Sequence, residues 1–352
     1  MIIDSIYFEI TNRCNLNCVD CYNASGRNTV TVELPPEVLL SAMTTLYNRF
    51  GTVKFDFSGG EPTLYRQLPQ LLEQLCARKE PFSYLFITNG IIRDETLYRL
   101  LETDRRFSVQ FSIDGTDEAS YSKMRGAGHF ETVMQHVSSL RAINPVVCKM
   151  VVTRHNMDLI ESYAHLIRGY GCRPFFSFVC PQGNAKGNWE GLMLTGKEKM
   201  AVLRRILQEA GENAGPAGIP YPTMFCPLTA ENEKWNLSVK PGGSIMPCQL
   251  FDESERFSLG NAYDDDWDTI MQRMKAFQVR LAERRERDYG CSKCINSELC
   301  RRGCPAMAAI IQDGDLFAPD GECTYRRLTT AYFVAKGSKM NQEQTERVYP
   351  PM

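Results

Sequence analysis

Two groups of cysteines carry the chemistry that this sequence of 352 residues suggests most directly. The first group has the spacing C-x3-C-x2-C and consists of Cys14, Cys18 and Cys21. Three thiolates within eight residues can surround one metal centre, but a structural zinc site needs a fourth ligand and the nearest histidine is His129. A 4Fe-4S cluster held by three cysteines instead leaves one iron open to a substrate or a cofactor.

The second group of cysteines occupies the last third of the chain. Its spacing runs C-x16-G-x4-C, then C-x2-C-x5-C-x3-C, then a single cysteine, and its members are Cys226, Cys248, Cys291, Cys294, Cys300, Cys304 and Cys323. A chain with fourteen cysteines and no export signal points to metal or redox chemistry rather than to disulfides. The other four cysteines stand alone in apolar or strand-like surroundings and are predicted to be small buried side chains: Cys76, Cys148, Cys172 and Cys180.

Short runs of β-branched and aromatic residues alternate with amphipathic stretches over the first two thirds of the chain. The runs predict six strands: Ser5 to Ile10, Val53 to Phe57, Ser83 to Ile87, Phe107 to Ile113, Val146 to Val152 and Pro174 to Val179. Between them, Pro36 predicts the first turn of one helix and Asn156 the N-cap of another. Such alternation is typical of parallel βα units, and six of them predict a partial (β/α)6 barrel of the TIM type in an α/β protein.

The sequences that follow the strands are the most unusual in the chain. They read TNRCNLNCVDCYN, SGGEPT, TNG, SIDG, TRHN and CPQGNAKG in strand order. In α/β barrels the loops that leave the carboxyl ends of the strands build the active site. We therefore expect these loops to meet on one rim, with Gln182, Asn184 and Lys186 of the last loop free to meet a substrate.

The C-x3-C-x2-C loop after the first strand and SGGEPT after the second resemble the radical SAM superfamily. The resemblance implies that Cys14, Cys18 and Cys21 bind a 4Fe-4S cluster whose open iron chelates the amino and carboxylate groups of S-adenosylmethionine. In that family an electron from the cluster splits the sulfonium and produces a 5'-deoxyadenosyl radical. The resemblance therefore implies an enzyme, a radical SAM oxidoreductase.

The resemblance also implies a set of residues that bind S-adenosylmethionine. The motif that cradles the methionine amino group is matched by Gly59, Gly60, Glu61 and Pro62. Glycines let backbone carbonyls approach, and a carboxylate can accept from an ammonium group. Ser112 and Asp114 resemble the strand end that contacts the ribose, and Arg125 resembles the basic residue that pairs with the methionine carboxylate. The family often has an aromatic residue before the third cysteine, where this chain has Asp20.

The seven C-terminal cysteines resemble the SPASM domain of radical SAM enzymes, which would bring the total to three 4Fe-4S clusters. By this resemblance one auxiliary cluster is bound by Cys291, Cys294, Cys300 and Cys323. The other auxiliary cluster is bound by Cys226, Cys248 and Cys304, and no further cysteine follows Cys226 closely. Its remaining iron is completed by a non-cysteine group or water, or stays open for a substrate.

Auxiliary clusters can carry an electron away from a substrate radical, so we expect oxidative modification or cross-linking of a ribosomally made peptide. The alternatives are sulfatase-maturase-like oxidation, dehydrogenation or epimerisation of a sugar or cofactor and, in another class, a non-catalytic metal-binding scaffold. Gln249 occupies the position where sulfatase maturases have an acidic base, which disfavours the first alternative. The catalytic base stays unknown, because a solvated turn explains Asp252 and Glu253 as well as a proton acceptor does.

Composition limits the partners and the location. A net charge of -2 offers no attraction for nucleic acid, and no apolar run reaches the about eighteen residues that a membrane span needs. We expect a cytoplasmic protein whose partners are a peptide substrate, a separate peptide-recognition protein and an electron donor of the flavodoxin or ferredoxin type. The Gly- and Pro-rich segment 211–222 predicts a radical SAM barrel over 1–215, a SPASM domain over 216–335 and a tail over 336–352.

Overall fold

Six parallel strands follow one another in chain order through the first half of the fold. They are β1 (Ile2–Thr11), β2 (Lys54–Gly59), β3 (Ser83–Thr88), β4 (Phe107–Ser112), β5 (Val147–Val152) and β6 (Arg173–Phe178). The computed structural model describes residues 2–140, 146–210, 219–222, 228, 234–298, 300 and 302–335. All six strands expected from the sequence are present, and the partial barrel is confirmed.

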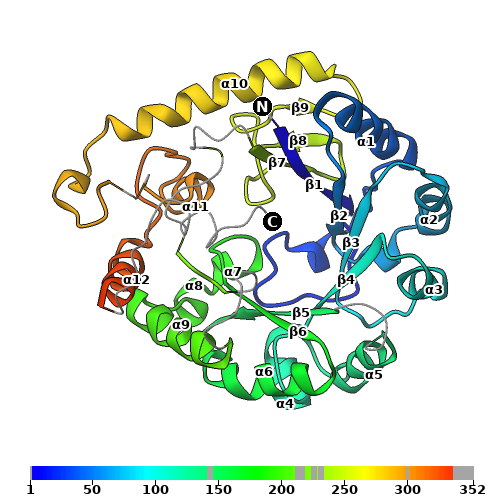
Figure 1. Ribbon diagram of the computed structural model, residues 1–352, viewed down its shortest axis with the longest axis horizontal. Helices are drawn as coiled ribbons and strands as arrows, with labels where there is room; N and C mark the ends of the chain where they lie inside the picture. Colours follow the sequence, from blue (N-terminus) through cyan, green and yellow to red (C-terminus); the bar gives the residue numbers. More distant parts are fainter. Residues whose placement is uncertain are drawn as a thin grey trace.

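Helices connect these strands and lie on the outer side of the curved sheet (Figure 1). They are α1 (Pro36–Phe50), α2 (Leu68–Ala77), α3 (Glu95–Thr103), α4 (Glu118–Arg125), α5 (Phe130–Leu140) and α6 (Ile160–Gly169). Pro36 begins α1 as predicted, and Gly51 ends it with a left-handed φ of 69°. Apolar side chains of these helices and of the strands form one continuous core.

Three more strands extend the sheet on the other side of β1. β7 (Lys234–Val239) pairs in parallel with β1, and β8 (Ser244–Met246) and β9 (Gly260–Asn261) continue the sheet in antiparallel orientation. The order is β6-β5-β4-β3-β2-β1-β7-β8-β9, so the sheet does not close. The segment that the sequence assigns to a separate domain therefore begins inside the sheet of the barrel. The predicted boundary at 215 lies outside the described residues, as does the predicted tail over 336–352.

The other helices lie after β6 and after β9. They are α7 (Asn184–Gly187), α8 (Trp189–Leu192), α9 (Gly196–Ala210), α10 (Trp267–Ala282), α11 (Pro305–Ile311) and α12 (Cys323–Ala335). Short 3-10 helices are η1 (Ser25–Arg27), η2 (Pro62–Leu64), η3 (Met157–Leu159), η5 (Glu283–Arg285) and η6 (Cys291–Lys293). α12 packs against α9, which attaches the cysteine-rich region to the barrel (Figure 1). Within the described ranges, each helix is too short or too polar for a transmembrane span.

The two faces of the barrel strands differ in chemistry. On β2, Phe55 and Phe57 are buried in the core with the helices, while Asp56 and Ser58 face the inner side because side chains alternate along a strand. The same alternation puts polar residues from other strands on the inner side: Tyr7, Glu9, Gln110, Ser112, Lys149 and Ser177. A barrel interior that serves stability alone is filled by branched apolar residues. The polar inner face therefore indicates a binding function.

Candidate active site and cysteine clusters

The loop that follows β1 brings Cys14, Cys18 and Cys21 close together. Burial is the main cause that raises the pKa of the Cys14 thiol to about 11, and the charge of Cys21 acts in the same direction. Burial also raises the pKa of Cys18, whose thiol lies near Cys21 as well. Leu16 N–H donates a hydrogen bond to Cys14 Sγ at 3.4 Å. Cys18 is buried, and Cys14 and Cys21 are half-buried. Among the described residues no three His, Cys, Asp or Glu side chains already stand in metal-binding geometry, so the fit to a metal centre rests on the nearness of the thiols, whose protons a bound metal would remove.

The Gly-Gly-Glu-Pro segment lies against the beginning of this cysteine loop. Gly60 N donates to Thr11 O at 2.7 Å, and Glu61 N donates to Arg13 O at 2.8 Å. A Cβ atom on Gly59 would lie 2.3 Å from Thr11 O. A Cβ atom on Gly60 would lie 2.1 Å from Arg13 O. Both positions require glycine because the two backbones touch, and this contact fixes where the cysteine loop starts.

The Glu61 carboxylate joins the ends of two strands. It is 1% exposed and accepts hydrogen bonds from Thr63 N and Oγ1, from Thr88 Oγ1 at 2.7 Å and from Asn89 N at 2.7 Å. Burial raises the pKa of Glu61, and these hydrogen bonds oppose the shift. The sequence suggests that this carboxylate accepts from an ammonium group, but its neighbours already supply four donors. Cofactor binding by residues 59–62 stays a prediction. The backbone of the segment is a better candidate for contacting the cofactor than the Glu61 carboxylate.

Asp114 and Arg125 form a buried ion pair beside the cysteine loop. Asp114 is fully buried, and its Oδ2 accepts from Arg125 Nε at 2.6 Å. Its Oδ1 accepts from Val151 N at 2.6 Å. Arg125 Nη1 in turn donates to Cys18 Sγ at 3.8 Å. Asp114 therefore orients Arg125 toward the cysteines, and both of its oxygens are already engaged, so its predicted ribose contact has no support in this geometry.

Polar side chains continue from this ion pair onto the inner face of the sheet. Ser112, at the carboxyl end of β4, is half-buried and lies in register with Lys149 of β5. Asp20 is 9% exposed, and burial followed by the charge of Asp114 raises its pKa to about 7. Burial lowers the pKa of Lys149, while the nearby Cys180 thiol and the carboxylates oppose the shift. The ribose contact of Ser112 stays a prediction, and Asp20 puts a carboxylate where the family often has an aromatic ring.

The loop after β6 contacts the later part of the cysteine loop. Asn184 N donates to Cys21 O at 2.8 Å, and Asn184 Nδ2 donates to Asn17 Oδ1 at 2.8 Å and to Cys18 O at 2.7 Å. Gly183 has a φ of 58°, and a Cβ atom there would lie 2.2 Å from Cys21 O. The expectation that Asn184 is free to meet a substrate is wrong, because its side chain is buried and its Nδ2 group donates two hydrogen bonds inside the protein. Lys186 is exposed, and Gln182 is half-buried.

Replacing Asn184 with alanine is expected to weaken the cysteine loop. The change removes the Nδ2 hydrogen bonds to Asn17 Oδ1 and to Cys18 O, and Cys18 O keeps only the 3.3 Å bond from Cys21 N. Losing two hydrogen bonds should lower the free energy of unfolding by about 1–3 kcal/mol. The iron retained at the loop after reconstitution should fall as well. Lys186→Ala, two residues away on the exposed side, should change stability by less than about 0.5 kcal/mol. Both variants are compared by urea unfolding and iron analysis. If the two behaved alike, Asn184 would not stabilise the cysteine loop.

Two further asparagines connect the rim loops: Asn89 directly follows β3, and Asn156 lies four residues after the end of β5. Asn89 Nδ2 donates to Asn15 Oδ1 at 2.8 Å, which ties the β3 loop to the cysteine loop. Asn156 Nδ2 donates to Asp114 O at 3.1 Å, and Asn156 Oδ1 accepts from Thr153 N at 2.8 Å. Asn156 occupies the N-cap position of η3, directly before α6, but its side chain makes no capping hydrogen bond because the amide turns back toward Asp114. The prediction that the strand-end loops meet on one rim is confirmed.

Four of the C-terminal cysteines surround one pocket, which we call the four-cysteine pocket. It is lined by Cys291, Cys294, Asn296, Ser297, Cys300, Arg302, Pro319, Cys323 and Arg326. Burial raises the pKa of both the Cys300 and the Cys323 thiols, and each is opposed first by the positive charge of Arg326. The pocket brings together the four cysteines that the resemblance assigns to one auxiliary cluster. A cavity bounded by four thiols and a buried cation fits an anionic metal-sulfur group.

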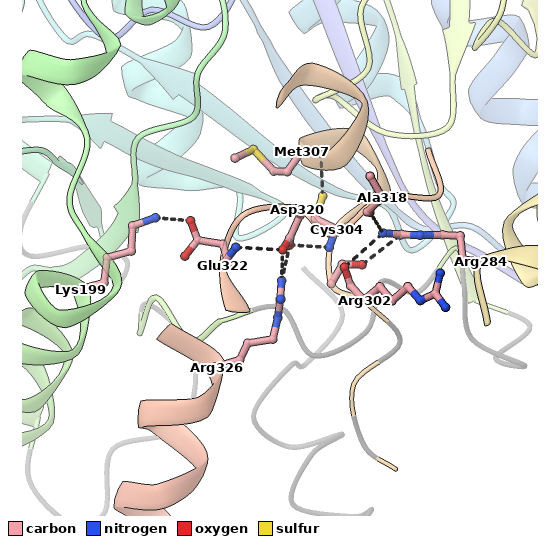
Figure 2. A network of polar contacts seen from close by, with 10 residues as sticks. Lys199, Arg284, Arg302, Cys304, Met307, Ala318, Asp320, Glu322 and Arg326 are labelled. Atoms are coloured by element: carbon pink, nitrogen blue, oxygen red, sulfur yellow. Dashed lines mark hydrogen bonds and ion pairs between the residues drawn. The ribbon is translucent and has the colours of Figure 1, made fainter. Parts of the chain in front are cut away.

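A buried network joins this pocket to Cys304 (Figure 2). Asp320 pairs with Arg326, and Asp320 Oδ2 accepts from Cys304 N at 2.8 Å. Asp320 Oδ1 accepts from Glu322 N at 3.1 Å, and Lys199 of α9 pairs with Glu322 at 2.5 Å. The network therefore connects the two cysteine sets with each other and with the barrel. Cys226, the third member of the second set, lies outside the described residues.

Cys248 lies near the carboxyl ends of β1 and β7 and does not line the four-cysteine pocket. Burial raises the pKa of its thiol to about 11. Close by, Lys240 Nζ pairs with Glu9 at 2.6 Å and donates to Gln249 O at 3.3 Å. Both members of the pair are about 3% exposed. The sequence did not reveal them, because no local feature shows that Glu9 on β1 and Lys240 directly after β7 are buried together. Asp252 and Glu253 are exposed, as expected for a solvated turn.

Among the lone cysteines, Cys148 and Cys172 are buried as predicted. Cys180 is only half-buried at the end of β6. Burial raises the pKa of its thiol, and the charges of Lys149 and Lys199 oppose the shift. Its surroundings are therefore charged, which differs from the apolar surroundings that the sequence suggests.

Comparison with known proteins identifies the two cysteine regions. The model of the radical SAM superfamily matches residues 8–167, and the model of the iron-sulfur cluster-binding domain SPASM matches residues 226–295. Mycofactocin maturase MftC of Mycobacterium ulcerans is 28% identical over 333 residues, which cover 90% of this chain and 86% of the relative. PqqA peptide cyclase of Granulibacter bethesdensis is 24% identical over 309 residues, which cover 81% of each protein.

Solved structures agree with the fold. The crystal structure of Streptococcus suis SuiB bound to the precursor peptide SuiA has a TM-score of 0.72 and covers 92% of this chain and 76% of that one. Its sequence identity is 13%, so this similarity concerns the fold.

Proposed function

Because the chain belongs to the radical SAM superfamily and carries a SPASM iron-sulfur domain, we propose that it matures a ribosomally made peptide by oxidative modification or cross-linking. The observation that carries the proposal is the similarity to a maturase over 90% of the chain, which spans both cysteine regions. A peptide cyclase is similar over 81%. The polar inner face of the barrel supports a peptide substrate, because backbone amides need hydrogen-bonding partners.

The rim residues fit the cofactors of the family. Cys14, Cys18 and Cys21 would hold a 4Fe-4S cluster, and residues 59–62 with Ser112 would bind S-adenosylmethionine. When bound, these groups supply a 5'-deoxyadenosyl radical that abstracts a hydrogen atom from the substrate. The chain itself contributes positioning: Asp114 holds Arg125 with its positive charge toward Cys18 Sγ, where it would pair with the methionine carboxylate.

Two auxiliary 4Fe-4S clusters complete the proposal. One would be held by the cysteines of the four-cysteine pocket, and the other by Cys226, Cys248 and Cys304. A carboxylate, water or the substrate would complete the second cluster. The barrel would comprise 1–215 and the SPASM domain 216–335, although β7 to β9 pair with the barrel sheet.

Three further features belong to the proposal. Reduction of the clusters requires an electron donor, for which a flavodoxin or a ferredoxin is suitable. A separate recognition protein would bring the peptide to the rim. We place the enzyme in the cytoplasm, where reducing conditions keep thiols available for clusters.

The test is anaerobic reconstitution with iron and sulfide, followed by reduction with S-adenosylmethionine and an assay for 5'-deoxyadenosine. The native protein should produce it, and a variant with Cys14→Ala, Cys18→Ala and Cys21→Ala should not, while it keeps about eight irons from two auxiliary clusters. A precursor peptide added to the native protein should lose hydrogen mass. Intact clusters without cleavage under any reductant would exclude the radical mechanism and favour a scaffold.

A further inference from the structure

We infer that Asn296 and Arg326 raise the reduction potential of the cluster held in the four-cysteine pocket. The inference rests on the proposed function, in which this pocket binds a 4Fe-4S cluster. It concerns two side chains that are not cluster ligands and that line the pocket together with the cysteines.

Asn296 is a buried amide without a hydrogen-bonding partner among the described residues. It is 2% exposed, and neither Oδ1 nor Nδ2 has a partner. An unsatisfied buried amide costs about 1–3 kcal/mol, so its presence indicates a partner that the protein atoms do not supply. Because Asn296 lines the pocket, that partner is the pocket's occupant. A cluster offers sulfur acceptors to which Nδ2–H can donate.

Arg326 brings a buried positive charge to the same pocket. Its side chain is 2% exposed, and it is held by the ion pair with Asp320, which is not among the lining residues (Figure 2). Gly303 makes room for this arrangement, because a Cβ atom there would lie 2.2 Å from Asp320 Oδ2 and also collide with the guanidinium of Arg326. The pair therefore has its cationic member at the pocket wall, and the charge of Arg326 acts on the Cys300 and Cys323 thiols more strongly than the opposing charge of Asp320 does.

The direction of the effect follows from charge. Reduction adds one negative charge to a cluster that its four thiolates already make anionic. A hydrogen-bond donor and a cation at the wall of the pocket stabilise that extra charge, and they do so strongly because the surroundings are buried. Both side chains therefore favour the reduced cluster and shift its potential upward. The cluster therefore accepts an electron more readily than it would if the four cysteines bound it without Asn296 and Arg326.

The decisive variant is Asn296→Leu, studied in the full chain after Cys14, Cys18 and Cys21 are replaced by alanine. The two remaining clusters are titrated with reductant and followed by EPR. We expect full iron content and a more negative midpoint potential for one cluster only. Asn296→Leu should not destabilise the cluster-free protein, because the amide has no protein partner to lose. An unchanged potential with full iron would overturn the role of Asn296.

Arg326 is tested by Arg326→Lys and Arg326→Gln, with Lys293→Gln as the matched control. Lys293 is exposed and adjacent to Cys294, so solvent screens its charge. The potential should fall most for Arg326→Gln, less for Arg326→Lys and not measurably for Lys293→Gln. Equal shifts for Lys293→Gln and Arg326→Gln would overturn the role of Arg326. If Arg326→Gln fails to fold, the comparison of Arg326→Lys with the native chain decides, and an unchanged potential overturns it.

A separate variant distinguishes failure of the inference from failure of the proposed function. Cys294→Ala in the same background should remove or alter one EPR signal. If both signals and the iron content are unchanged, the four-cysteine pocket holds no cluster and the proposed ligand set is wrong. If one signal is altered by Cys294→Ala while Asn296→Leu and Arg326→Lys leave the potential unchanged, only the inference is wrong.

Discussion

Replacing Gly60 with alanine is expected to remove the barrel cluster and to reduce S-adenosylmethionine cleavage by at least about 100-fold. The added Cβ would lie 2.1 Å from Arg13 O and 2.5 Å from Arg13 C. These are backbone atoms, so no side-chain rotation can relieve the overlap. The hydrogen bond from Gly60 N to Thr11 O at 2.7 Å would also be strained. The cysteine loop must move, and the three thiols are then no longer positioned to bind one cluster.

The matched control for this prediction is Gly187→Ala. Gly187 lies in α7, and a Cβ atom there meets no heavy atom within 4 Å. Alanine in a helix is more stable than glycine by about 0.5–1 kcal/mol, so this variant should be neutral or slightly stabilised. Iron content after reconstitution and 5'-deoxyadenosine formation are measured for both variants. Full cluster binding by Gly60→Ala would show that the contact between the two loops does not determine the site.

Asp114→Asn is expected to lower the free energy of unfolding by about 3–5 kcal/mol, because it leaves the guanidinium of Arg125 buried without its counter-ion. The side chain keeps its shape, so the effect reports charge rather than a cavity. Arg125 should also lose its orientation toward Cys18 Sγ, and cleavage activity should fall with it. Chemical unfolding of the cluster-free protein measures the first effect, and the assay for 5'-deoxyadenosine measures the second.

Asp268→Asn provides the control for that substitution. Asp268 pairs with Arg49 on the surface between α1 and α10, and its side chain is 72% exposed. An exposed ion pair contributes at most about 1 kcal/mol, so this variant should remain close to the native protein in stability and activity. Similar losses for Asp114→Asn and Asp268→Asn would mean that burial does not strengthen the pair beside the cysteines.

The sequence alone determined the barrel and the location of its site. Apolar alternation with a period of two, interrupted by helical stretches, is a local property, so all six parallel strands could be predicted. The strand-end loops had to share one rim once the strands were parallel. The spacing of Cys14, Cys18 and Cys21 likewise specified a three-thiol loop without reference to distant residues. The resemblance extended this to Cys291, Cys294, Cys300 and Cys323, which line one pocket.

Only the tertiary structure decided which polar side chains form hydrogen bonds inside the protein and which stay exposed. Asn184 and Lys186 are two residues apart in the same loop, yet one is buried against the cysteine loop and the other is exposed. β7 joins β1 across more than two hundred residues, and β9 has only two residues, so neither carries a strong local signal. Strand pairing over long distances and burial depend on the whole chain. They decide whether a polar residue binds a neighbouring loop, forms a buried ion pair or lines a metal pocket.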